Sequence, residues 1–224
     1  MDSGKFWRRR LRPAISHALL ASLALVAGAQ EPARTVDDAQ GLAALEAFLA
    51  DVHSLTAEFK QEIWGKDQTL LQTETGTLAL ERPNRFRWIY REPTELTVVA
   101  DGTKLWIYDK DLEQVTVAPL DDTIATSPAM LLSGDRSVRE GFTVEESYEH
   151  EGLDWIKLVP KTGGSDFTSV RIGFEGKAPK RLELVDGLNE VTRITLENLV
   201  VNPELEDATF DFEVPPGAEV SGEG

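Results

Sequence analysis

Residues 86–108 read FRWIYREPTELTVVADGTKLWIY, and this stretch decides the fold class. Its apolar runs at 86–90, 96–100 and 105–108 have the length and composition of β-strands. The Asp101-Gly102 pair between the last two runs is typical of a tight hairpin turn. Since such short connections join antiparallel neighbours, the stretch predicts an antiparallel sheet.

The same alternation continues on both sides of this stretch and predicts a mainly β protein. Eleven strands are expected, in a group of six and a group of five, at 55–64, 69–80, 86–90, 96–100, 105–108, 115–118, 142–148, 155–159, 167–174, 180–185 and 191–201. An amphipathic helix carrying Leu42, Leu45 and Leu49 precedes them, and a short helix at 127–132 separates the groups. A sheet this large tends to curl, close into a barrel or split into a sandwich.

The first 29 residues have the features of a secretory signal peptide. Five basic residues precede an apolar run, and Ala27-Gly28-Ala29 fits a cleavage site. About fourteen apolar residues are fewer than the roughly twenty that span a membrane. We therefore expect residues 1–29 to be cleaved, residues 30–217 to form one domain and residues 218–224 to be a flexible tail.

The composition excludes several classes of protein. The chain has 224 residues, no Cys and a formal net charge of −16. Without Cys there is no disulfide framework, thiol nucleophile or Cys-ligated metal. Because the predicted leader carries five basic residues and one acidic residue, the mature chain is more acidic still, at −20. Such a charge argues against a nucleic-acid partner.

No catalytic motif stands out. After the leader only His53 and His150 remain, too few for a histidine metal triad. There is no nucleophile elbow and no phosphate-binding loop. The sequence therefore predicts no enzyme activity, no metal site and no cofactor. A hydrolase that uses some of the many acidic residues stays open as an alternative.

The strand at 86–90 separates its side chains into an aromatic set and a basic set. Phe86, Trp88 and Tyr90 share one face, whereas Arg85 and Arg87 share the other. If no bulge intervenes, Arg82 lies on the aromatic face. A cation on an apolar surface needs acceptors, and the free carbonyls at the end of the helix at 127–132 are candidates.

Two further strands, at 96–99 and 105–108, are apolar on both faces. Two short helices are thin cover for eleven strands, so we expect part of this apolar surface to line a cavity for an apolar ligand. A simple filled core is the alternative. The expected cavity and lid residues are Phe86, Trp88, Tyr90, Val99, Trp106, Tyr108, Met130, Leu131 and Leu132.

The mature chain resembles the periplasmic outer-membrane lipoprotein carrier family, LolA. The resemblance rests on the motifs ERPNRFRW at 81–88, ADGTKLWIYD at 100–109 and SPAMLL at 127–132. It implies a single unclosed antiparallel β-barrel with a helical lid over a hydrophobic cavity. It also implies that Arg82 latches the lid and that Phe86 helps to dock a membrane transporter.

The resemblance implies a function without covalent chemistry. Such a carrier accepts the acyl chains of lipoproteins from an inner-membrane ABC transporter and delivers them to an outer-membrane receptor. A periplasmic monomer without cofactor or nucleic acid is then expected. The alternative is a general periplasmic protein that binds or senses lipids or other hydrophobic ligands.

Overall fold

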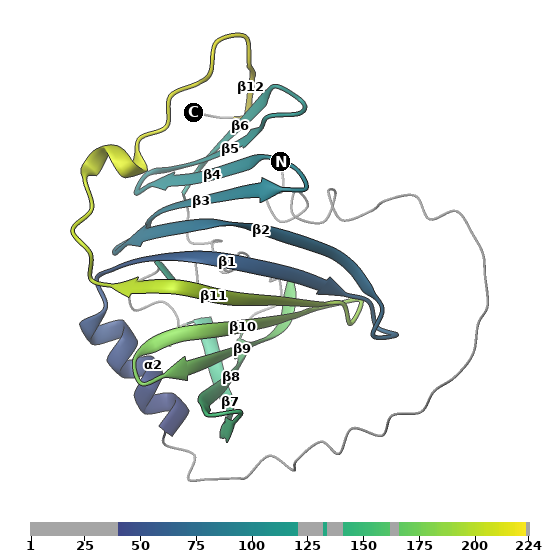
Figure 1. The fold of residues 1–224 in the computed structure, drawn as a ribbon, viewed down its shortest axis with the longest axis vertical. Coiled ribbons are helices and arrows are strands. Elements are labelled where there is room, and N and C mark those ends of the chain that lie inside the picture. The colour runs from purple at the N-terminus through teal and green to yellow at the C-terminus, as the bar shows by residue number, and fades with distance from the viewer. Residues whose placement is uncertain (1–39, 121–131, 134–140, 162–165, 223–224) are drawn as a thin grey trace.

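One curled sheet dominates the computed structural model, which describes residues 40–120, 132–133, 141–161 and 166–222. A helix packs on one of its faces (Figure 1). The elements are α2 (Gln40–Asp51), β1 (Ser54–Trp64), β2 (Leu70–Glu81), β3 (Arg85–Glu92), β4 (Leu96–Asp101), β5 (Lys104–Asp109), β6 (Gln114–Pro119), β7 (Phe142–His150), β8 (Leu153–Pro160), β9 (Phe167–Glu175), β10 (Ala178–Asp186), β11 (Val191–Val201), the 3₁₀ helix η2 (Asp207–Phe210) and β12 (Glu219–Gly222).

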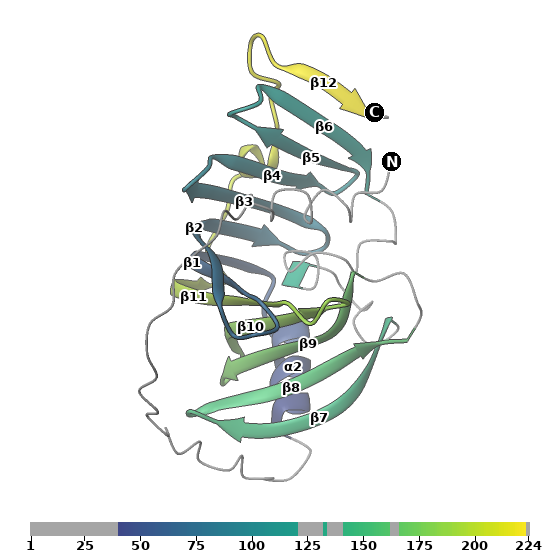
Figure 2. The ribbon, with the colours of Figure 1, turned by 90° about the vertical axis from the view of Figure 1, so that its right-hand side faces the viewer.

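The sheet consists of two meanders joined in the middle. Its order is β12-β6-β5-β4-β3-β2-β1-β11-β10-β9-β8-β7, so β1 pairs antiparallel with β11. The two strand groups expected from the sequence are thus the two meanders, and β6 and β7, consecutive in the chain, lie far apart in the sheet. Among the described residues β7 and β12 are edge strands that do not meet, and the sheet curls without closing (Figure 2).

The tail at 218–224, which was expected to be flexible, contains a strand in the structure. Glu219–Gly222 form a twelfth strand, β12, parallel to β6, with Val220 opposite Val115. The amide of Glu219 donates to the carbonyl of Glu113 at 2.9 Å. Pairing satisfies backbone groups that an edge strand would leave open, and it needs no apolar alternation in the added segment. The sequence accordingly carried no signal for it.

Cross-strand register separates two faces of the sheet. Leu78 on β2, Trp88 on β3 and Val98 on β4 lie side by side and point to one face. Helix α2 packs on this same face, where Phe48 meets Phe174 of β9 at 5.8 Å between ring centroids. We call it the α2 face, and the opposite one the outer face. The main buried apolar cluster lies on the α2 face.

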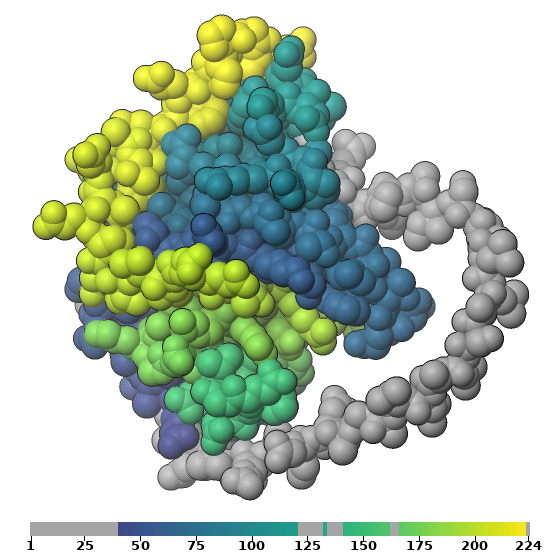
Figure 3. Space-filling view, viewed as in Figure 1, coloured from purple at the N-terminus to yellow at the C-terminus, as the bar shows by residue number. Residues whose placement is uncertain are grey.

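The C-terminal segment covers part of the outer face. After η2 it runs along one side of the sheet toward β12 (Figures 1 and 3). The ring of Phe212 stacks on Trp106 at 5.4 Å and approaches Tyr108 at 6.4 Å. The guanidinium of Arg87 donates to the carbonyls of Thr209 and Asp211. The apolar side chains on the outer face at this end of the sheet are thus covered by the C-terminal segment.

Removing the Phe212 ring should loosen this covering. Phe212→Ala is expected to lower the free energy of unfolding by about 1 kcal/mol, the magnitude of an aromatic pair. It should also make the C-terminal segment more susceptible to limited proteolysis. Urea unfolding and protease digestion measure the two effects. Val214→Ala, at an exposed site two residues away, is the control, and an equal effect there would contradict the role given to Phe212.

The hairpin between β4 and β5 owes its turn to Asp101. One carboxylate oxygen of Asp101 accepts from the amides of Thr103 and Lys104, and the other accepts from Nε1 of Trp106 at 3.0 Å. Burial alone would raise the pKa of Asp101, but these hydrogen bonds outweigh it and lower the pKa to about 2. The charged form of Asp101 is therefore tied to the folded hairpin.

The free energy of unfolding should therefore depend on the ionisation of the Asp101 carboxylate at acidic pH. Because the folded pKa is below the unfolded one, the contribution is complete above about pH 4 and is lost as the pH falls toward 2. Asp101→Asn should lower the free energy of unfolding by about 1 kcal/mol at pH 7, allowing for solvent screening at a partly exposed site. Urea unfolding at pH 7 and pH 2.5 should show this difference shrinking. A constant difference, or an equal one for the exposed Asp111→Asn, would contradict the assignment.

Candidate binding site on the α2 face

Aromatic rings form the centre of the α2 face. Phe86, Trp88 and Tyr90 alternate along β3 and are at most 2% exposed. Phe59 of β1 packs against them, 4.8 Å from Trp88 and 5.1 Å from Tyr90 between ring centroids. The sequence correctly placed the three β3 aromatics on one face but did not identify Phe59. The result is a wide apolar surface.

The position of the Phe59 ring depends on Gly76 of β2. A Cβ atom at Gly76 would lie 2.7 Å from the Phe59 ring and would overlap the carbonyl oxygen of Ile89. Gly76 pairs directly with Phe59 on one side and Tyr90 on the other. Because Gly76 has no side chain, the Phe59 ring can occupy the space where a Cβ atom would lie.

Arg82 connects the end of α2 to Leu132. Its Nη1 donates to the carbonyls of Phe48 and Leu49 in the last turn of α2, at 3.4 and 3.2 Å. Its Nε and Nη2 donate to the carbonyl of Leu132, at 3.2 and 2.9 Å. The guanidinium also lies 4.2 Å above the Phe48 ring. Arg82 thus satisfies carbonyls that helix ends leave without partners.

The sequence suggested only part of this arrangement. It pointed to the helix at 127–132 as a partner of Arg82, and Leu132 accepts two of its hydrogen bonds. The acceptors on α2 were missed, although the end of any helix offers free carbonyls. Leu132 is fully buried in the main cluster. Met130 and Leu131 lie outside the described residues.

Three of the expected cavity residues lie on the opposite face. Val99 pairs with Trp106, and Trp106 with Val117, one residue out of phase with Trp88 and Val98. Val99, Trp106 and Tyr108 therefore point to the outer face, where Phe212 of the C-terminal segment packs on Trp106 and Tyr108. The prediction that they share a surface with Phe86 is corrected. Period-two alternation cannot assign faces in a strand that is apolar on both.

The predicted docking residue Phe86 is 1% exposed. Its ring lies on the α2 face between Leu80 and Ala100 on the neighbouring strands. In this conformation Phe86 offers no surface to a partner. A docking role would require the elements packed above it to move.

The α2 face becomes polar toward the β1–β2 hairpin. Gln61 and Gln72 both donate to the carboxylate of Glu74, at 2.7 and 2.9 Å, and the hydroxyl of Tyr90 lies 3.4 Å from Oε1 of Gln61. Burial raises the pKa of Tyr90 well above its usual range, and the charge on Glu74 adds to this. Sequence alternation alone gave no reason to single out these residues.

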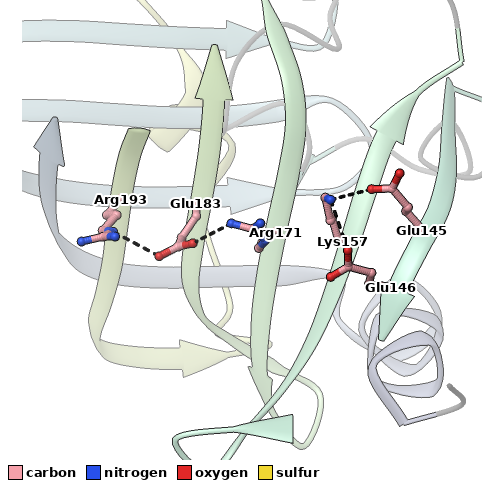
Figure 4. Close-up of polar contacts among 6 residues, drawn as sticks. All are labelled: Glu145, Glu146, Lys157, Arg171, Glu183 and Arg193. Carbon is pink, nitrogen blue, oxygen red and sulfur yellow. Dashed lines mark hydrogen bonds and ion pairs between the residues drawn. The ribbon is translucent and has the colours of Figure 1, made fainter. Parts of the chain in front are cut away.

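The outer face of β8 to β11 carries ion pairs, beside the stacked rings of Trp155 and of Tyr148 on β7. Glu183 lies between Arg193 and Arg171, at 3.1 and 3.4 Å, and Lys157 meets Glu145 and Glu146, at 2.6 and 3.3 Å (Figure 4). These cross-strand pairs suit a solvated surface. In this half of the sheet the two faces therefore differ sharply in polarity.

Two kinds of site are absent from the described residues. No three His, Cys, Asp or Glu side chains there are grouped so that they could hold a metal ion. No helix in the described part of the chain is long and apolar enough to cross a membrane. The candidate functional site is the apolar α2 face with its Arg82 contacts, as the buried cluster and these hydrogen bonds define it.

Comparison with known proteins agrees with this geometry. The family model of the outer membrane lipoprotein carrier protein LolA matches residues 50–213. An outer-membrane lipoprotein carrier protein from Dechloromonas aromatica is 40% identical over 179 residues, covering 80% of this chain and 86% of its own. One from Methylobacillus flagellatus is 38% identical over 185 residues, covering 83% and 90%.

Among solved structures, an uncharacterized conserved protein from Thermus thermophilus has a similar fold. Its TM-score is 0.51 at 14% identity, and the match covers 83% of this chain and 98% of that one. This likeness concerns the fold alone. The family model and the two relatives concern the sequence and extend over most of its length. This chain therefore belongs to the LolA family of outer-membrane lipoprotein carrier proteins.

Proposed function

We propose that this protein is a periplasmic chaperone that holds the acyl chains of lipoproteins on its α2 face during transport to the outer membrane. It receives them from an inner-membrane ABC transporter and passes them to an outer-membrane receptor. The observation that carries the proposal is the large apolar cluster on the α2 face, in a sheet whose outer face carries ion pairs along β8 to β11. The predicted export signal at 1–29 agrees with a periplasmic location.

The physical requirement on such a carrier is shelter for hydrocarbon in water. Each CH₂ group withdrawn from water contributes about 0.8 kcal/mol, so acyl chains leave a membrane only for a comparably apolar surface. The aromatic and aliphatic side chains of β1 to β4 and β8 to β11 provide that surface. No covalent step is needed, and the carrier acts by binding and release.

Release requires a conformation in which the α2 face is covered without cargo. The structure supports this role for Arg82, whose guanidinium joins the end of α2 to Leu132 above the aromatic rings. We therefore propose that Arg82 stabilises the closed, empty carrier. Binding of cargo breaks the Arg82 hydrogen bonds. Because these bonds can form again only when the carrier is empty, they favour transfer of the cargo to the receptor.

Mass spectrometry of the protein purified from the periplasm of its own cells tests the proposal. The expected result is triacylated lipoprotein bound in near-stoichiometric amount. Free phospholipid in its place would show a general lipid binder and contradict the carrier role. Turnover of an added lipid ester would show a hydrolase, which the proposal excludes.

A further inference from the structure

One indole on the α2 face has an unusual environment. Trp88 is 1% exposed, and its Nε1 is fully buried with no hydrogen-bond partner in the described structure. A buried N–H without an acceptor costs about 1–3 kcal/mol. A phenylalanine would fill an apolar site without that cost.

The side chains around Trp88 explain why its N–H has no partner. Level with it on the neighbouring strands lie only apolar residues, namely Ala57, Leu78, Val98 and Ile107. The rings of Phe59 and Tyr90 pack beside it, at 4.8 and 6.4 Å between centroids. This part of the surface thus offers one hydrogen-bond donor within hydrocarbon.

We propose that Trp88 Nε1 donates a hydrogen bond to an ester carbonyl of the diacylglyceryl group of the cargo. The inference rests on the proposed function, because it assumes that acyl chains lie on the α2 face. An ester joins an apolar chain to a carbonyl acceptor and brings no donor of its own. An amide would bring an N–H as well, and the apolar residues level with Trp88 offer no acceptor for it. The ester is therefore the better match.

The chain contains a matched control for this indole. Nε1 of Trp64 is also buried without a partner, but Trp64 lies on the outer face, 5.4 Å from the guanidinium of Arg193. Replacing either tryptophan with phenylalanine removes the same atoms. Only Trp88→Phe removes a donor from the proposed binding surface.

Calorimetric titration with 1,2-didodecanoylglycerol and with its diether analogue, 1,2-didodecylglycerol, tests the inference. The two lipids have equal chain lengths, and only the diester has carbonyl groups. Trp88→Phe should weaken binding of the diester about fivefold more than binding of the diether, which corresponds to the roughly 1 kcal/mol of one hydrogen bond, because both lipids lose the same ring contacts. Trp64→Phe should alter neither. Equal losses for both lipids, or no loss for the diester, would overturn the role of Trp88.

Infrared spectroscopy of the complex gives a second reading, which does not depend on the binding affinity. The ester carbonyl stretch of the bound diester should include a component at lower frequency, which Trp88→Phe abolishes. A bound ester with only the unbonded frequency would overturn the inference while leaving the carrier role intact. Failure of the wild-type protein to bind either lipid would instead contradict acyl binding on the α2 face, and with it both proposals.

Discussion

Arg82→Leu should yield a carrier that loads normally but retains its cargo. Among the described residues the guanidinium donates to the carbonyls of Phe48, Leu49 and Leu132, and these hydrogen bonds hold α2 and Leu132 together. Hydrogen bonds to a charged group contribute about 1.5–3 kcal/mol each when measured by deletion. Leucine fills part of the space but donates nothing, so the closed, empty conformation loses its main polar support.

The consequence for transfer follows from the populations of the two conformations. A closed, empty state competes with cargo binding and lowers the apparent affinity for acyl chains. If the closed state loses about 3 kcal/mol, the equilibrium shifts roughly a hundredfold toward the open, loaded form, since 1.4 kcal/mol is a factor of ten. Delivery to the receptor becomes unfavourable by the same factor.

Transfer from the loaded carrier to outer-membrane vesicles measures this effect. Arg82→Leu should release little of its lipoprotein, and Arg82→Lys should behave in between, because an ammonium cannot reproduce the planar set of guanidinium donors. Arg85→Leu is the matched control, since Arg85 lies three residues away on the outer face and pairs with Glu81 and Asp207. Normal transfer by Arg82→Leu would refute the latch.

Gly76→Ala should produce the largest loss of stability. The added Cβ would overlap the carbonyl oxygen of Ile89 and press into the ring of Phe59. Gly76 lies in β2, between β1 and β3, so neither neighbouring backbone is free to move away. Overpacking in such a place costs about 3 kcal/mol or more.

Urea unfolding followed by far-ultraviolet circular dichroism checks this prediction. The midpoint should fall with little change in slope, since the same surface is exposed on unfolding. Gly187→Ala is the matched control, because no atom beyond its two chain neighbours lies within 4 Å of the corresponding Cβ in the β10–β11 turn. It should change stability by less than about 0.5 kcal/mol. Comparable losses for both variants would contradict the packing described around Phe59.

Local patterns predicted the strands well. The expected strand at 55–64 corresponds to Ser54–Trp64, and the one at 86–90 lies within Arg85–Glu92. The Asp101-Gly102 turn connects β4 and β5 as expected. These features depend on neighbouring residues, whose alternation and turn chemistry are visible in the sequence.

Long-range arrangements were harder to predict. Pairing of β1 with β11 joins segments about 140 residues apart and has no local signal. Val99, Trp106 and Tyr108 were assigned to the wrong face because their strands are apolar on both sides, and the covering by Phe212 comes from a distant segment. The aromatic set of β3 was placed correctly because arginines alternate with it.

The most direct test of the central claim uses two tryptophans on opposite faces. One variant keeps Trp88, on the α2 face, as its only tryptophan, and another keeps only Trp106, on the outer face. The indole fluorescence of each variant therefore reports on one face of the sheet. Each is loaded with a synthetic triacylated lipopeptide whose acyl chains carry bromine, which quenches nearby indole fluorescence. We predict strong quenching of Trp88 and little of Trp106. Quenching of Trp106 alone, or equal quenching of both, would contradict binding of acyl chains on the α2 face.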